Sequence, residues 1–123
     1  MTRRLPEILA ERAGPGGVEL DLRVPPDLEY FAGHFPGLPI LPGVVQIDWS
    51  VRLGRARLPV RGDFAAAEQV KFLAVVRPEA RLTLTLELKA ENTRMNFTYA
   101  GKDRRYSSGT LVFGAPWPSS LAA

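Results

Sequence analysis

The segment from Val44 to about Ala56 constrains the fold most, because it is the one stretch of the chain that predicts a long helix. Pro42 and Gly43 come directly before it, and proline is well placed near the start of a helix. Its apolar side chains cover most of the helical circumference: Val44, Val45, Ile47, Trp49, Val51 and Leu53. A helix that is apolar nearly all round is usually buried. The rest of the chain must therefore supply a layer that covers it.

The other regular segments read as strands. The clearest runs from Arg81 to Lys89, where four leucines alternate with polar residues, and Val18 to Val24 alternates in the same way. Further strands are expected over residues 67–76, 95–99 and 106–113, with hairpin-sized connectors at 78–79, 91–92 and 101–103. Residues 14–17 read as a loop, and the tail after residue 115 as frayed.

This order predicts a strand, a long loop, one buried helix and a four-strand meander. One apolar helix and one antiparallel sheet must cover each other, which indicates an α+β protein with a curved sheet wrapped around a central helix, the hot-dog arrangement. The chain has 123 residues, the size of one ordinary domain. We therefore expect a single domain over residues 1–123.

Composition excludes several classes of function. The chain has no cysteine and one histidine, so disulfides, a thiol nucleophile and structural zinc are not expected. No apolar run approaches the roughly 18–20 residues of a membrane span, and the arginines near the N-terminus precede no signal-peptide core. A cytoplasmic protein is expected. The formal net charge is +3, but the arginines are dispersed, which favours an acidic protein partner over nucleic acid.

Three groups near the start of the helix could perform chemistry. His34 lies in a loop dense in Gly and Pro, and histidine can take a proton near neutral pH; a lone histidine more often only bonds loop carbonyls. Asp48 lies on the apolar helix, where desolvation could make it a proton donor; it could also be an exposed edge residue. Gly43 opens the helix, and its N–H could polarise a carbonyl oxygen, or the glycine could serve only the turn.

The run from Gly33 through Pro42-Gly43-Val44 to Asp48 resembles the signature of the β-hydroxyacyl-acyl-carrier-protein dehydratases. In that family a loop histidine and a helix acid lie fourteen positions apart, as His34 and Asp48 do. The similarity spans roughly residues 18–113. The sequence of residues 41–49 is especially similar to that of the small dehydratase-like proteins encoded with aryl-polyene and related acyl-carrier pathways.

The resemblance implies a hot-dog fold and a role for each residue. His34 would remove the proton beside the thioester, Asp48 would protonate the departing β-hydroxyl, and the Gly43 N–H would hold the thioester carbonyl. Three further residues would bind substrate: Val44, Phe35 and Pro42. The product would be a trans-2-enoyl thioester in fatty-acid, aryl-polyene or polyketide-type biosynthesis.

The resemblance also implies partners. His34 and Asp48 of one site would come from opposite subunits of a homodimer or higher even oligomer. The substrate would arrive on the phosphopantetheine of an acidic acyl carrier protein, with no metal and no redox cofactor. Four arginines follow the site helix and are either a carrier docking patch or a solvated helix end: Arg52, Arg55, Arg57 and Arg61.

Three departures favour a specialised relative. The acid is Asp, as in the dehydratase/isomerase class, where the common short class has Glu. Arg52 stands where both classes usually carry Gln, and the N-terminal region is shorter than that of the common class. Two other functions remain open: a hot-dog acyl thioesterase, and a catalytically weak hot-dog module in an acyl-carrier complex.

Overall fold

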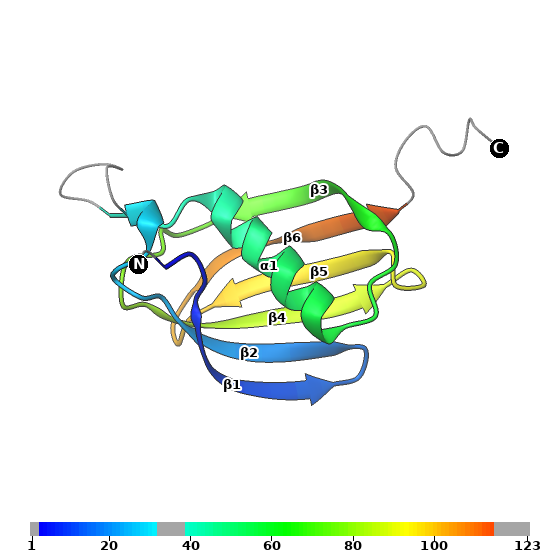
Figure 1. Ribbon diagram of the computed structural model, residues 1–123, viewed down its shortest axis with the longest axis horizontal. Coiled ribbons are helices and arrows are strands. Elements are labelled where there is room, and N and C mark those ends of the chain that lie inside the picture. Colours follow the sequence, from blue (N-terminus) through cyan, green and yellow to red (C-terminus); the bar gives the residue numbers. More distant parts are fainter. Residues whose placement is uncertain (1–2, 32–38, 115–123) are drawn as a thin grey trace.

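The computed structural model describes residues 3–31 and 39–114, in which one helix lies across one face of a six-stranded antiparallel sheet (Figure 1). The strand order is β1-β2-β4-β5-β6-β3. In chain order the elements are β1 (Glu7–Gly14), β2 (Gly17–Arg23), the 3-10 turn η1 (Glu29–Phe31), α1 (Gly43–Arg57), β3 (Asp63–Phe72), β4 (Arg81–Lys89), β5 (Arg94–Ala100) and β6 (Arg105–Gly114). The expected hot-dog class is confirmed.

The core lies between α1 and the concave face of the sheet. The leucines of β4 sit at its centre, because Leu84 pairs with Leu20 on one side and with Tyr99 on the other. Trp49 of α1 is fully buried against them, and its indole N–H donates to the Arg4 carbonyl at 2.8 Å. The alternation that predicted β4 thus places its apolar half against the helix.

The N-terminal segment forms a strand that the sequence did not indicate. β1 pairs with β2 through the turn at Pro15-Gly16, where Gly16 has a φ of 69°. Nearly every residue of β1 is exposed, and its register shifts between Ile8 and Ala10. An edge strand with no buried face has no alternation to reveal it.

The predicted four-strand meander was wrong at β3. This strand pairs with β6 at the edge of the sheet, and β4 pairs instead with β2 and β5. The segment after β3 is a crossover. Backbone hydrogen bonds hold it from Leu41 N to Val76 O and from Val24 N to Ala80 O. Periodicity identifies strands, but partners are chosen by how the whole sheet covers the helix.

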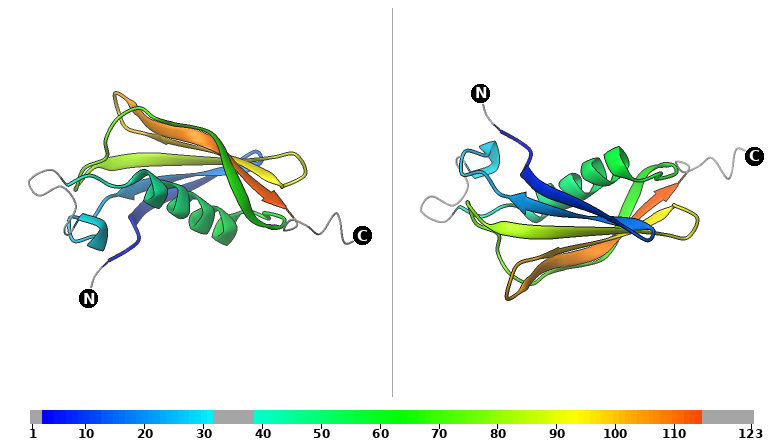
Figure 2. Two further views of the ribbon diagram at one scale, coloured as in Figure 1. Left: turned by 90° about the horizontal axis from the view of Figure 1, so that it is seen from above. Right: turned by 90° about the horizontal axis from the view of Figure 1, so that it is seen from below.

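The helix is buried on one side only, which corrects the expectation of full burial (Figure 2). The buried side presents Val45, Gln46, Trp49, Ser50, Leu53 and Gly54. On the other side Val44 is 74% exposed, and Ile47 and Val51 are partly exposed. An apolar side chain this exposed on a helix indicates a surface that another chain could cover.

The strand β3 adds to this uncovered surface. All of its residues except Val70 are exposed, including Phe64 and Phe72. Two register shifts interrupt its pairing with β6, and Gln69 has a φ of 51°. We call the outer side of α1 together with β3 the open face. Within residues 3–31 and 39–114, no helix has the length and apolar character needed to cross a membrane.

Candidate functional site

Four of the predicted site residues lie together at the start of α1. Pro42 is its N-cap, Gly43 and Val44 begin its first turn, and Asp48 follows on the second turn. His34 and Phe35 lie outside the described residues. Where the chain is described again, the Leu41 N–H donates to Val76 O at 2.8 Å, which anchors the approach to α1 on the sheet.

The first turn of α1 offers unused hydrogen-bond donors. The carbonyl of Pro42 accepts from the N–H groups of Val45 and Gln46 at 3.1 and 3.3 Å. The N–H groups of Gly43 and Val44 find no acceptor in the part of the chain that the structure describes. Such groups carry the partial positive charge of the helix dipole. They are suited to stabilise negative charge on a carbonyl oxygen.

Gly43 has a close neighbour, whereas its backbone has no positive φ that would call for glycine. A Cβ at this position would lie 2.5 Å from Cζ of Phe72, and the rest of that ring would be almost as near. The Phe72 ring, from the end of β3, therefore packs directly against the start of α1, while the residue stays 52% exposed. A side chain at position 43 would displace this ring.

Asp48 stands between an apolar and a basic depression. Its side chain is 46% exposed, and Oδ2 accepts from Nε of Arg52 at 2.8 Å. A depression of about 350 Å³ on one side is lined by Val44, Ile47, Asp48, Val51, Phe64 and Ala67. A second, of about 190 Å³, is lined by Arg4, Leu5, Tyr30, Asp48 and Arg52.

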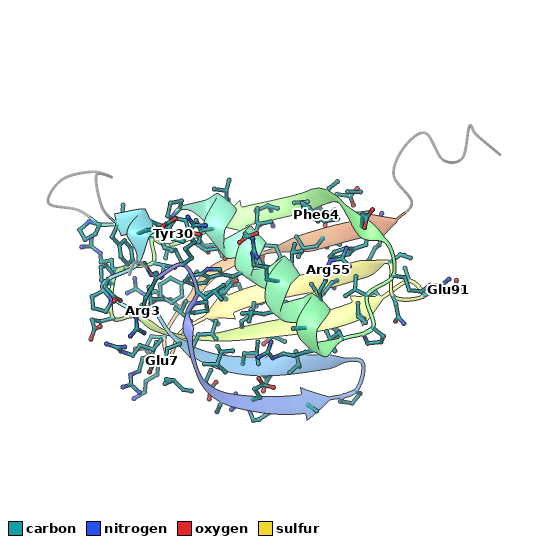
Figure 3. The ribbon with its side chains drawn as sticks, viewed as in Figure 1. Arg3, Glu7, Tyr30, Arg55, Phe64 and Glu91 are labelled. Atoms are coloured by element: carbon teal, nitrogen blue, oxygen red, sulfur yellow. The ribbon has the colours of Figure 1, made fainter. Side chains whose placement is uncertain are left out.

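Figure 3 shows Tyr30 in η1, near the start of α1, and Phe64 on the β3 side of the helix. The apolar depression suits an acyl chain, and the carboxyl at its border suits a polar group on that chain. Because Asp48 faces water within one chain, the desolvation expected for a proton donor requires a cover over the open face.

A buried polar cluster holds the same turn of α1 to the sheet. The Gln46 carbonyl accepts from the hydroxyl of Tyr99 at 2.7 Å, and Ser50 Oγ lies 2.9 Å from that hydroxyl. The Gln46 side chain accepts from Ser107 Oγ at 2.7 Å and donates to the Leu41 carbonyl at 3.4 Å. Burial raises the pKa of Tyr99, with Ser50 opposing the shift. The cluster fixes the position of the first turn, and with it that of Gly43 and Asp48.

The four arginines that follow the site along the chain contact different neighbours. Arg52 binds Asp48, Arg57 forms an ion pair with Glu11 of β1 at 2.7 Å, and Arg55 lies 5.2 Å from the ring centre of Phe113 of β6. Arg61 is exposed and has no ion pair in the described part. Three of the four therefore engage separate parts of the chain instead of forming one patch.

The sequence did not indicate several residues around Asp48. Phe64 and Ala67 come from β3, and Arg4 and Tyr30 come from the N-terminal part of the chain. Their distance in sequence from the loop and helix hid them. The one available signal was the apolar content of β3. Among the described residues no group of three or more His, Cys, Asp or Glu side chains could hold a metal ion.

The comparisons with known proteins agree on one fold, and a family model that covers most of the chain shows the family. The family model described as ApeI-like, ApeI dehydratase, matches residues 10–110. A chain of the dehydratase heterocomplex ApeI:P from Xenorhabdus doucetiae is 30% identical with a TM-score of 0.80, over 87% of this chain and 96% of that one. An uncharacterized protein from Erwinia carotovora subsp. atroseptica is 34% identical with a TM-score of 0.78, over 89% and 96%. The PpsC dehydratase domain from Mycobacterium tuberculosis, 17% identical with a TM-score of 0.69 over 94% of this chain and 45% of that one, shares the fold.

Proposed function

The chain belongs to the ApeI-like dehydratase family, and from that premise we propose that it removes water from 3-hydroxyacyl thioesters carried on an acyl carrier protein, giving trans-2-enoyl thioesters in polyene or polyketide-type biosynthesis. One observation carries the proposal. Unused N–H donors at Gly43 and Val44 and the carboxyl of Asp48 lie on successive turns of one helix, beside an apolar depression.

The proposed reaction moves protons and no redox electrons. His34 takes the proton from the carbon beside the thioester, and the electron pair moves toward the carbonyl, whose oxygen the Gly43 N–H stabilises. As the carbon–carbon double bond forms, the β-carbon–oxygen bond breaks and Asp48 protonates the leaving hydroxyl, releasing water. Proton exchange then restores His34 and Asp48. This chemistry calls for no metal and no redox cofactor.

The proposed site is completed by a second copy of the chain across the open face. The exposed apolar side chains of α1 and β3, together with the unpaired edge of β3, are the surface that such a copy would bury. It would also shield Asp48 from water. The similar Xenorhabdus chain comes from a heterocomplex, so a related chain in place of the second copy is the alternative.

Turnover of a 3-hydroxyacyl thioester tests the proposal directly. The rise of enoyl-thioester absorbance is the expected result. Release of free thiol would instead support the thioesterase alternative. If a folded protein gives neither signal with thioesters of several chain lengths, that result would support the catalytically weak module.

Arg52→Gln is expected to increase kcat about two- to fivefold, a range that follows from the modest strength of exposed ion pairs. The Arg52 guanidinium only donates hydrogen bonds, so it can hold the ionised form of Asp48 but cannot accept from a protonated carboxyl. An amide can do both, and therefore can hold the acid in the form that gives up a proton.

The matched control for this change is Arg55→Gln, which removes an exposed arginine one turn along that does not touch Asp48. Comparing kcat for the two variants isolates the Arg52–Asp48 contact. A lower kcat for Arg52→Gln alone would show that the arginine orients the acid productively.

A further inference from the structure

Cations without an ion-pair partner gather at one end of the sheet. Eight of the sixteen Lys and Arg residues form ion pairs in the structure. Of the remaining eight, Arg55 lies in the last turn of α1 and Arg61 lies shortly after the helix. The other six are all exposed, have no ion pair in the described part, and form what we call the basic end: Lys71, Arg77, Arg81, Lys102, Arg104 and Arg105.

Three of these residues, Lys71, Arg81 and Arg105, lie at strand ends, and the other three lie in the connectors between strands. β3 and β5 finish, and β4 and β6 begin, at the end of the sheet where α1 starts (Figure 1). Two depressions lie on the face of the sheet away from α1. Lys71 and Arg105 border one, and Arg81 and Lys102 border the other. Two acids lie among them: Asp103, in the turn between β5 and β6, and Glu79, which forms an ion pair with Arg23 of β2.

Glu91 lies at the opposite end (Figure 3), and the Arg61 N–H donates to the carbonyl of the adjacent Asn92. Glu91 and Asp63, which begins β3, are acids without an ion pair in the described part.

The basic end adjoins the proposed site. Lys71 precedes Phe72, whose ring packs against Gly43. Arg77 follows Val76, whose carbonyl accepts the N–H of Leu41 two residues before Gly43. A partner bound to these cations would therefore sit beside the helix start, where the thioester carbonyl is proposed to bind.

We propose that the basic end is the docking surface for an acidic protein, the carrier that delivers the thioester; this rests on the proposed function. Exposed cations without ion-pair partners attract an acidic protein surface over a long range and speed its association. The cations come from three strands and the connectors between them, and four of them border two different depressions instead of lining one. The proposal moves docking away from the arginines after α1, three of which already contact other parts of the chain.

Two matched double variants test the location. Arg104→Glu/Arg105→Glu reverses two cations of the basic end, and Arg61→Glu/Lys89→Glu reverses two at the opposite end. Each pair changes the formal net charge from +3 to −1. The dissociation constant for a holo-acyl carrier protein of net negative charge is measured at low and high salt. The basic-end variant is expected to bind at least about tenfold more weakly at low salt, and the control within about twofold of the parent protein.

Turnover separates docking from chemistry. The kcat/KM for a carrier-bound substrate is expected to fall in the basic-end variant, whereas that for the small N-acetylcysteamine thioester stays unchanged. The proposal would be overturned if both variants weakened carrier binding equally, or if neither variant weakened it. So would a loss confined to binding of anionic phospholipid vesicles or single-stranded RNA. If the parent protein turns over neither thioester, the proposed function fails, while carrier binding still decides the location of docking.

Discussion

Asp48→Asn is expected to reduce the dehydration rate by roughly 10²–10⁴-fold, the range for loss of a general acid or base, while the protein stays folded. The amide keeps the shape of the side chain but cannot donate a proton as an acid does. Its carboxyl lies at the rim of an apolar depression and is half exposed, so the core does not depend on it. The rise of enoyl absorbance at saturating substrate gives kcat, and thermal unfolding checks the fold.

Asp63→Asn is the matched control, because it changes an exposed acid on β3 that has no ion pair in the described part. It should retain the parent rate. Asp48→Glu should keep partial activity, since a longer acid can still reach the leaving group, and His34→Ala should be as inactive as Asp48→Asn. Full activity in a folded Asp48→Asn protein would reduce Asp48 to a structural role.

Mixing two inactive variants is expected to restore activity to roughly a quarter of the parent level, if each site takes His34 from one subunit and Asp48 from the other. In a mixed dimer of His34→Ala and Asp48→Asn chains, one site carries both changes and the other carries neither. Random exchange makes about half of the dimers mixed, each with one good site of two. The open face, with exposed Val44 and Phe64 beside Asp48, is where the second chain is expected.

Differently tagged chains must first show that subunits exchange, since a dimer that never dissociates would also stay inactive. Co-purification through both tags isolates the mixed species for assay. A verified mixed dimer without turnover would place both residues within one chain. It would also remove the reason to seek the cover of Asp48 in a second copy.

Much of the site and the central strands could be predicted because their signals are local. The strict alternation of Arg81–Lys89 predicted β4 with its observed bounds, since period-two apolar residues suit a strand with one face on the core. The helix was predicted to within a residue at each end. Proline is tolerated only in the first turn of a helix, so Pro42 marks its start, and the apolar pattern ends near Arg57. Gly43 and Asp48 could be proposed as site residues because both lie on that one element.

Tertiary structure alone decided what lies around those residues. The same apolar circumference that predicted a buried helix contains Val44, which is exposed, because one sheet can cover only one side of one helix. The place of β3 at the sheet edge, beside β6, brings Phe72 against Gly43 and places Phe64 in the depression that Asp48 borders. No local pattern encodes either arrangement. Charge shows the same division. The sequence by itself determined that the chain is basic, but only folding paired half of its cations with acids and left six others at one end. Ion pairs depend on which strand ends meet, and strand order is a property of the whole sheet.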